Sequence, residues 1–227
     1  GGGHLMGDWL SELAECFRGR VCLAGLGRLG GGDDAFGVCL AERLARLEAR
    51  PGVRVLAAGT DLESCAHRLS AGRDDHVIFL DAVAAGQTPG TMIWMGGADL
   101  QNRFPAVSTH RLSLGLLARA IEDGGATCCW LLGVEPAALS LGAALSPVVA
   151  GVLEELYRWL EHRVARSPLH ELPPLPAFGH PLPREPRGRG QGEGAFCGSG
   201  IQGENLRLAN SRAAAKRFAA AGGPGVS

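Results

Sequence analysis

The apolar positions along the chain alternate between short continuous runs and longer stretches with helical spacing. Continuous runs are typical of strands that are covered on both faces of a sheet. Stretches in which apolar residues recur every three to four positions are typical of helices that bury one side. The runs expected as strands are residues 21–25, 53–58, 76–83, 90–95 and 127–134. The stretches expected as helices are residues 9–17, 33–49, 62–71 and 109–121, and a longer helix that begins at Ser146-Pro147.

Local signals refine this assignment at three places. Ser146 is a good N-cap and Pro147 suits a first helical position, so a helix is expected to begin there. Residues 96–107 lack periodicity and are expected as a loop. The link between the strands at 76–83 and 90–95 is too short for a helical crossover, so these two strands are expected to pair antiparallel.

The alternation of strands and helices over residues 21–166 predicts an α/β fold. We expect three α/β/α layers, with a mostly parallel central sheet of about five strands and one antiparallel hairpin strand. The folded domain is expected at 20–166, after an N-terminal extension with a short helix at 1–19. Residues 167–227 are rich in Pro and Gly without sustained periodicity, so they are expected to be a disordered tail.

Composition excludes several classes of protein. The net charge of the 227 residues is -1, which provides no general attraction to nucleic acid or to an anionic membrane. No apolar run approaches the roughly 18 residues of a membrane span. The seven cysteines form no C-x-x-C pair and are expected as buried, reduced thiols. We therefore expect a cytoplasmic protein. The protein is also expected to be a monomer.

A glycine-rich segment, GLGRLGGGDDAFG, begins at Gly25 and joins the first strand to the first helix. This connection lies at the carboxyl edge of an open α/β sheet, where ligands bind. Gly25, Gly27 and Gly30 fit the G-x-G-x-x-G pattern of dinucleotide-binding loops. The acids Asp33 and Asp34 oppose this interpretation, because their charge would repel a pyrophosphate at the helix start. The second strand also lacks a terminal acidic residue.

Three polar residues are candidates for a metal site, each with a structural alternative. Asp33 is expected to cap the helix, and Asp34 favours the helix dipole in its simplest interpretation. Asp81 ends a buried strand, where a carboxylate needs a hydrogen-bond partner or a cation; alternatively it caps the next loop. His110 begins a helix, where the imidazole is favoured in its neutral, metal-binding form; alternatively it is a surface or capping residue.

Together, Asp34, Asp81 and His110 form a set of two carboxylates and one imidazole. Neighbouring parallel strands end at the same edge of a sheet, so Asp34 and Asp81 are expected to lie close together. Such mixed oxygen and nitrogen sites suit nickel or zinc and leave positions open for substrate. The cysteines lie inside strand or helix patterns and no G-x-S-x-G turn is present, so a nucleophilic enzyme is not indicated.

With these motifs the chain resembles the hydrogenase maturation endopeptidases, which process the large subunits of nickel–iron hydrogenases. The resemblance covers about residues 20–165, and its motifs occur in family order. They are Gly25, Gly27, Asp33, Asp34 and Gly37 in the loop, Leu80-Asp81-Ala82, Pro89-Gly90-Thr91, Ser108-Thr109-His110, Gly133-Val134-Glu135-Pro136 and Ser146-Pro147. Arg28 departs from the family, which has Asn at this position.

The resemblance implies an aspartic-type endopeptidase, a hydrolase that activates hydrogenase by removing the C-terminal extension of the nickel-loaded large-subunit precursor. It assigns metal contact and catalysis to Asp34, Asp81 and His110. The nickel would be supplied by the precursor, with no organic cofactor and no nucleic acid or membrane as partner. Two alternatives remain open: a nucleotide-binding, Rossmann-like oxidoreductase, and a non-catalytic metal-sensing module on the same fold.

Overall fold

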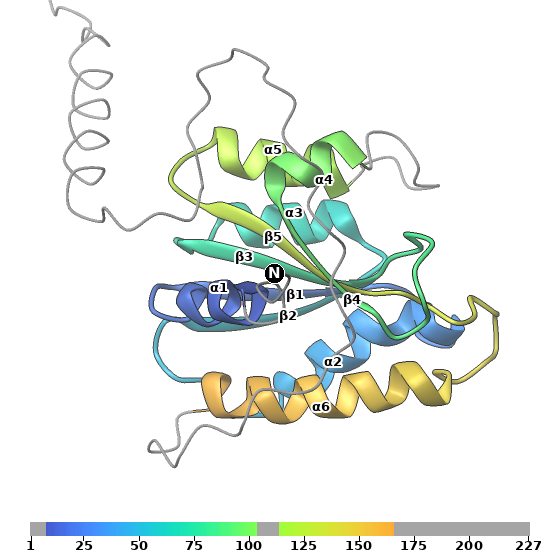
Figure 1. Ribbon diagram of the computed structural model, residues 1–227. Coiled ribbons are helices and arrows are strands. Elements are labelled where there is room, and N and C mark those ends of the chain that lie inside the picture. Colours follow the sequence, from blue (N-terminus) through green and yellow to red (C-terminus); the bar gives the residue numbers. More distant parts are fainter. Residues whose placement is uncertain (1–7, 104–113, 166–227) are drawn as a thin grey trace, which may run out of the picture. The chain divides into compact units, whose positions relative to one another are not determined.

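The computed structural model describes residues 8–103 and 114–165, and their elements follow the expected alternation of strands and helices (Figure 1). All of these residues belong to one compact unit, Gly1–Gln191. The strands are β1 (Val21–Leu26), β2 (Val53–Gly59), β3 (His76–Ala82), β4 (Met92–Gly96) and β5 (Cys128–Val134). The helices are α1 (Asp8–Cys16), the 3-10 turn η1 (Gly32–Ala35), α2 (Phe36–Leu44), α3 (Leu62–Ser70), α4 (Gly97–Arg103), α5 (Leu114–Asp123) and α6 (Pro147–Val164).

The five strands form one sheet in the order β2-β1-β3-β5-β4. Strands β1, β2, β3 and β5 are parallel, and β4 is antiparallel to β5. This confirms the mostly parallel sheet with one antiparallel strand. The expected pairing of β3 with β4 is wrong, because β5 lies between them: Gly133 of β5 pairs with Asp81 on one side and with Ile93 on the other. The intervening link has only to cross one strand, about 10 Å, so it forms no hairpin.

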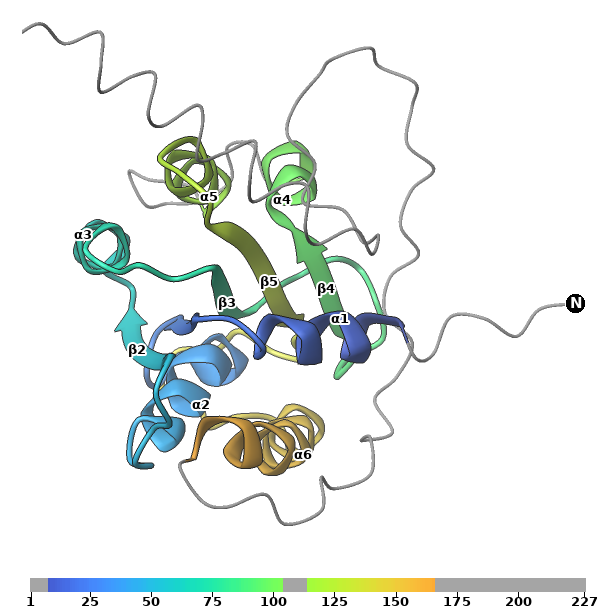
Figure 2. The same cartoon turned by 90° about the vertical axis from the view of Figure 1, so that its left-hand side faces the viewer.

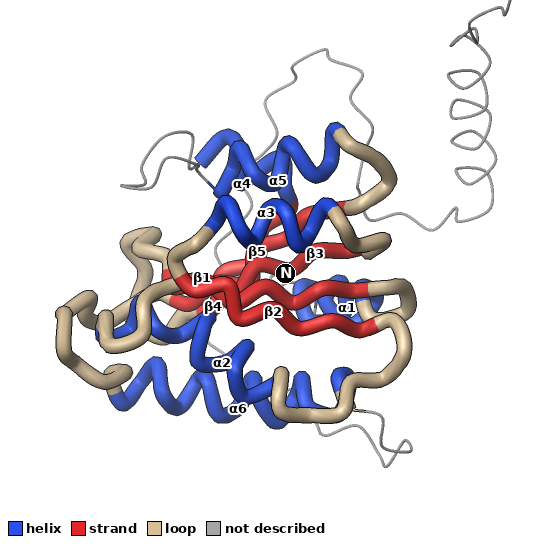
Figure 3. Tube along the Cα trace, turned by 180° about the vertical axis from the view of Figure 1, so that it is seen from behind, coloured by secondary structure: helices blue, strands red, loops and turns tan. Residues whose placement is uncertain are grey.

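Helices cover both faces of the sheet, which confirms the three-layer α/β/α architecture (Figures 1 and 2). Alternate residues of each strand point to opposite faces. Ile78 and Leu80 of β3 pack with α1, α2 and α6, whereas Val77 and Phe79 pack with α3, α4 and α5. The two layers of helices are also separate when the sheet is seen from behind (Figure 3). The continuous apolar runs in the sequence therefore have the expected cause.

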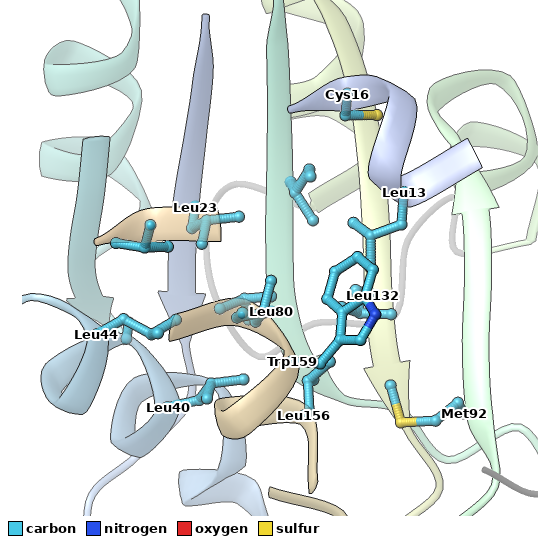
Figure 4. Packing of buried hydrophobic residues seen from close by; sticks show 14 of the residues in the cluster. Leu13, Cys16, Leu23, Leu40, Leu44, Leu80, Met92, Leu132, Leu156 and Trp159 are labelled. Carbon is cyan, nitrogen blue, oxygen red and sulfur yellow. The ribbon is translucent and has the colours of Figure 1, made fainter. Parts of the chain in front are cut away.

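The layer that contains α6 holds the largest fully buried side chain, Trp159. Figure 4 shows Trp159 and Leu156 of α6 facing Leu132 of β5, with Leu80 of β3 and Leu40 of α2 alongside. The start of α6 is set as expected, since the Ser146 hydroxyl accepts the amide N–H of Val149 and Pro147 occupies the first helical position. This packing holds α6 and α2 against the same face of the sheet.

Two helices differ from the sequence-based expectation. Residues 97–103, expected as part of a loop, form α4, whose one large apolar side chain, Leu100, is fully buried. A single apolar residue produces no periodicity, which explains the wrong prediction. The helix expected at 33–49 begins with the separate 3-10 turn η1 and ends at Leu44, so it is shorter than expected. The expected start of α5 at 109–113 lies outside the described residues.

Most described cysteines are free thiols, as expected. Cys16, Cys22, Cys65 and Cys129 are buried, and burial raises the pKa of each thiol. Cys128 is disulfide-bonded, so the prediction of a reduced thiol is wrong there. It stands at the half-buried start of β5, whereas Cys129 faces the core.

The expected domain boundaries at 19/20 and 166/167 stay predictions. The expected tail, 167–227, and residues 1–7 of the expected N-terminal extension lie outside the described residues, 8–103 and 114–165. No helix within those two ranges combines the length and apolar character required to cross a membrane.

Candidate active site

The loops that follow β1, β3 and β5 emerge at one end of the sheet (Figures 1 and 3). The first loop leads into η1, which carries Asp34, and β3 carries Asp81 as its second-last residue. The strands are parallel neighbours, so their carboxyl ends meet at this edge. The topology therefore brings the two predicted acids to the same end of the fold.

Close backbone contacts hold the segment that carries Asp34 against the end of β3. A Cβ atom added at Gly37 would overlap the carbonyl oxygen of Leu80, and one at Gly25 would overlap that of Gly37. Gly27 has a φ of 104°, and a Cβ there would overlap the carbonyl oxygen of Asp34. Only glycine permits this approach of α2 to β1 and β3. These glycines thus have a packing role that does not require a nucleotide.

Asp34 is half-buried, and its carboxylate closes the loop in front of it. Its Oδ2 accepts the backbone N–H of Arg28 at 2.9 Å. This bond fixes one carboxylate oxygen and leaves the second without a hydrogen bond among the residues that the structure describes. Asp34 therefore does more than favour the helix dipole, and it has an oxygen available to a ligand.

Asp81 is half-buried at the end of β3, with its Oδ1 accepting the N–H of Ala82 at 2.8 Å. Burial raises the pKa of Asp81 to about 7; the Ala82 amide acts in the opposite direction, and the nearby charge of Asp34 adds to the rise. The charge of Asp34 therefore acts on Asp81, in keeping with the position of both carboxyl groups at the same edge of the sheet. A carboxyl group with this pKa can accept a proton near neutrality, and two adjacent carboxylates attract a cation.

The third candidate, His110, lies outside the described residues, so its position relative to Asp34 and Asp81 stays a prediction. Within residues 8–103 and 114–165, no group of three His, Cys, Asp or Glu side chains could hold one metal ion.

Asp33 is structural, but the expected helix cap is wrong. Its side chain is fully buried and makes no cap hydrogen bond to η1. Instead, Oδ2 accepts the N–H groups of Ala137 and Ala138 and the hydroxyl of Ser146, at 2.8, 3.0 and 2.9 Å. Oδ1 accepts the Ser146 N–H at 2.7 Å. Burial tends to raise the pKa of Asp33, but these four bonds outweigh it and hold the pKa below its ordinary value. Asp33 thus pins the β5–α6 loop to the glycine loop.

Glu135 is a further buried acid, to which the sequence analysis assigned no role. Its Oε2 accepts the N–H of Ala85 at 2.8 Å, and its Oε1 accepts that of Gly86 at 3.3 Å. The side chain is only 6% exposed. It therefore fixes the loop that follows Asp81. The argument that identified Asp81, a carboxylate after a buried strand, would also have identified Glu135.

Most backbone N–H groups of the glycine loop already donate to acceptors within the protein. The N–H groups of Gly27, Arg28, Gly31, Gly32 and Asp33 donate to Gly59, Asp34, Arg28, Ala143 and Ala138 respectively. A phosphate-binding loop needs such groups free to point at the ligand. Together with the two acids at this edge, this pattern argues against the dinucleotide-binding alternative.

Replacing Gly37 with Ala is expected to lower the free energy of unfolding by about 2–3 kcal/mol, because the new methyl group forces α2 away from the backbone of Leu80. The same shift moves Asp34 relative to Asp81. Urea unfolding followed by circular dichroism measures the change.

Gly151→Ala is the matched control for Gly37→Ala. Gly151 lies on the exposed side of α6, and a Cβ there meets no atom within 4 Å. Alanine favours the helix, so this variant is expected to gain about 0.4–1 kcal/mol. Equal effects of the two substitutions would contradict the close approach at Gly37.

Comparison with known proteins gives one consistent result. Residues 38–162 match the HycI family model, described as hydrogenase maturation protease. The chain is 33% identical over 141 residues to the hydrogenase expression/formation protein HupD of Rhodobacter capsulatus. That alignment covers 60% of this chain and 66% of HupD, slightly less than two thirds of its length.

Two solved structures are also similar to this fold. The [NiFe] hydrogenase maturation protease HycI from Thermococcus kodakarensis KOD1 is 32% identical with a TM-score of 0.60, over 67% of this chain and 97% of that one. The hydrogenase maturating endopeptidase HybD from E. coli is 27% identical with a TM-score of 0.51, over 60% of this chain and 85% of that one.

Proposed function

This chain belongs to the hydrogenase maturation protease family, and on that premise we propose that it is an aspartic-type endopeptidase acting on a nickel-loaded [NiFe] hydrogenase large-subunit precursor. It removes the C-terminal extension of that precursor and so completes its maturation. We further propose that it works in the cytoplasm as a monomer, without an organic cofactor.

The observation that carries this proposal is that two carboxyl groups from distant segments lie at the same edge of the sheet. Asp34 and Asp81 lie close enough for the charge of one to raise the pKa of the other. Such a pair is unfavourable unless it shares a proton or binds a cation. A divalent ion presented by the substrate fits this arrangement, because carboxylate oxygens and an imidazole nitrogen suit nickel. In our proposal His110 supplies that imidazole.

The nickel belongs to the substrate. The residues of this protein bind the nickel and position the peptide bond beside it. Asp34, Asp81 and His110 bind the ion, which anchors the scissile peptide bond at the carboxyl edge of the sheet. Water attacks the carbonyl carbon after it is activated either by the cation or by a carboxylate as general base. A new C–O bond forms, the C–N bond breaks, and the proton taken from water passes to the leaving nitrogen.

This arrangement also explains how processing would wait for metal insertion. Without the ion, the precursor brings no cation to the two carboxyl groups and loses this anchoring contact. Binding therefore depends on the loaded state of the substrate, and no separate sensor is needed.

The decisive experiment offers the enzyme nickel-loaded and nickel-free precursor and follows the shortening of the precursor by mass spectrometry. We expect cleavage of the loaded form at one bond and at least about 100-fold slower cleavage of the nickel-free form, since loss of metal contact removes the anchoring interaction. Binding of loaded precursor without cleavage would instead favour the metal-sensing module. Tight binding of a nicotinamide cofactor, with no cleavage, would favour the oxidoreductase.

A further inference from the structure

Large apolar side chains are exposed mainly at the end of the sheet that carries the two acids. Among the described residues, they are Leu29, Leu116, Leu139, Leu141 and Val148, with exposed fractions of 56, 52, 58, 76 and 43%. All but Leu116 lie in the β1–η1 loop, the β5–α6 loop or the first turn of α6. Single exposed leucines are ordinary, but a cluster at one site is informative.

Backbone hydrogen bonds join the two loops that carry these leucines. The N–H of Gly142 donates to the carbonyl of Gly30 at 2.7 Å, and that of Gly32 donates to Ala143 at 3.2 Å. Leu29 and Leu141 each directly precede one partner of the first bond. The buried Asp33 carboxylate ties the same loops together at Ala138, next to Leu139. Leu29, Leu139 and Leu141, here called the leucine platform, are thus held outward by a fixed backbone.

The leucine platform lies next to Asp34 through Leu29. Leu29 follows Arg28, and the N–H of Arg28 is bound to the carboxylate of Asp34. An extended peptide advances about 3.3 Å per residue, so a chain that passes Asp34 reaches the platform within a few residues.

The chemistry of the platform favours an uncharged partner. Residues 136–146 contain no charged side chain, and Arg28 is the single cation in the facing loop between 25 and 34. A polyanion or an acidic membrane surface would need several cationic residues here. The platform also exposes at most a few hundred Å², which is less than the roughly 800 Å² per partner of a stable dimer. A short apolar peptide segment fits both the charge and the size.

We propose that the leucine platform binds apolar side chains of the precursor segment that flanks the scissile bond. This inference rests on the proposed function and extends it: Asp34 and Asp81 bind the metal centre, and the platform binds the adjoining polypeptide. The platform contacts substrate equally in the ground state and in the transition state, because it lies beside the reacting atoms rather than around them. Its contribution therefore appears in KM and not in kcat.

Steady-state cleavage of nickel-loaded precursor by the full chain tests this proposal. Leu141→Ser and Leu29→Ser are each expected to raise KM by about tenfold, with kcat unchanged. Leu141→Met should restore the parental KM, since Met keeps the apolar contact. Leu116→Ser is the matched control, because Leu116 is similarly exposed but lies on α5. It should leave both constants unchanged.

Replacing an apolar precursor residue beside the scissile bond with Ser supplies the second half of a double-mutant cycle. The losses should not add when this precursor meets Leu141→Ser, because both changes remove one contact. A parental KM for both leucine variants, or full additivity, would overturn the platform while leaving the proposed protease intact. Loss of a parental dimer in the Leu141→Ser variant would assign the platform to a second copy of this chain and also overturn the proposal. If the parental enzyme does not cut the precursor at all, the proposed function fails first and the platform with it.

Discussion

Replacing Asp81 with Asn is expected to slow cleavage of nickel-loaded precursor by more than about 100-fold, since even partners of metal ligands cost 10–100-fold when removed. Asn keeps the shape of the side chain and can accept the Ala82 N–H through its amide oxygen. It cannot carry the negative charge that binds a cation or accept the proton of water. Single-turnover cleavage measures the loss, and the same result is expected for His110→Ala.

The Asp81→Asn substitution should not destabilise the fold. Burial and Asp34 raise the pKa of Asp81 to about 7, so the folded state holds a proton that the unfolded state releases at lower pH. Stability from this group therefore falls as the pH rises from about 4 to about 7, and it levels off above the folded-state pKa. Removing the charge is expected to leave the free energy of unfolding at pH 8 equal or slightly higher. Loss of activity would then reflect chemistry rather than unfolding.

Asp75→Asn is the matched control for Asp81→Asn. Asp75 precedes β3 at its opposite end, where it forms an exposed ion pair with Arg20. An exposed pair contributes at most about 1 kcal/mol, and the residue lies at the amino edge of the sheet. This variant should cleave at the parental rate. If Asp81→Asn also cleaves at that rate, the assignment of Asp81 to the site is wrong.

The sheet and most helices could be predicted because burial leaves a period in the sequence. Strand β3 is covered on both faces and appears in the sequence as the continuous apolar run before Asp81. Ser146-Pro147 indicates where α6 begins. Helix α4 leaves no period, because Leu100 is its one large apolar side chain in the core. The pairing of β4 with β5 could not be predicted either. The length of the link before β4 limits its distance from β3, but it does not determine which strand β4 pairs with.

The acid pair could be predicted for a different reason. Parallel neighbouring strands end at one edge, so a polar residue after β1 and another at the end of β3 must approach each other. The same reasoning places Glu135, which follows β5, at this edge, but it does not reveal the backbone partners of Asp33 and Glu135. Their partners are backbone N–H groups at Ala137, Ala138 and Ala85, and every residue type except Pro offers such a group. Long-range contacts to the backbone leave no pattern in the side chains.

The two structural acids, Asp33 and Glu135, connect the loops around the site to one another. Asp33, beside Asp34, holds the β5–α6 loop, and Glu135, at the start of that loop, holds the segment that follows Asp81. The segments that carry Asp34 and Asp81 are thus both hydrogen-bonded to the β5–α6 loop. The position of Asp34 relative to Asp81 depends on these contacts as well as on the glycine contacts at Gly37.

The largest effect on stability is expected for Asp33→Asn, which should lower the free energy of unfolding by more than about 3 kcal/mol, because buried donors to a charged acceptor lose their partner. Asp33 accepts four hydrogen bonds, and three of them converge on Oδ2. The amide of Asn replaces one acceptor oxygen with a donor. At least one donor group must then remain unpaired. Urea unfolding at pH 7 measures the loss.

The pH dependence separates this cause from a general loss of packing. The folded-state pKa of Asp33 lies below its ordinary value, so its stabilisation is complete above about pH 4 and disappears as the pH falls through the lower, folded-state pKa. The parental protein should therefore lose stability more steeply below pH 4 than Asp33→Asn does. Asp61→Asn is the control: Asp61 caps α3 through the Ser64 N–H, and Asn caps equally well, so stability should change by less than about 0.5 kcal/mol. Parallel pH profiles for the parent and Asp33→Asn would show that the four hydrogen bonds to Asp33 do not hold the β5–α6 loop in place.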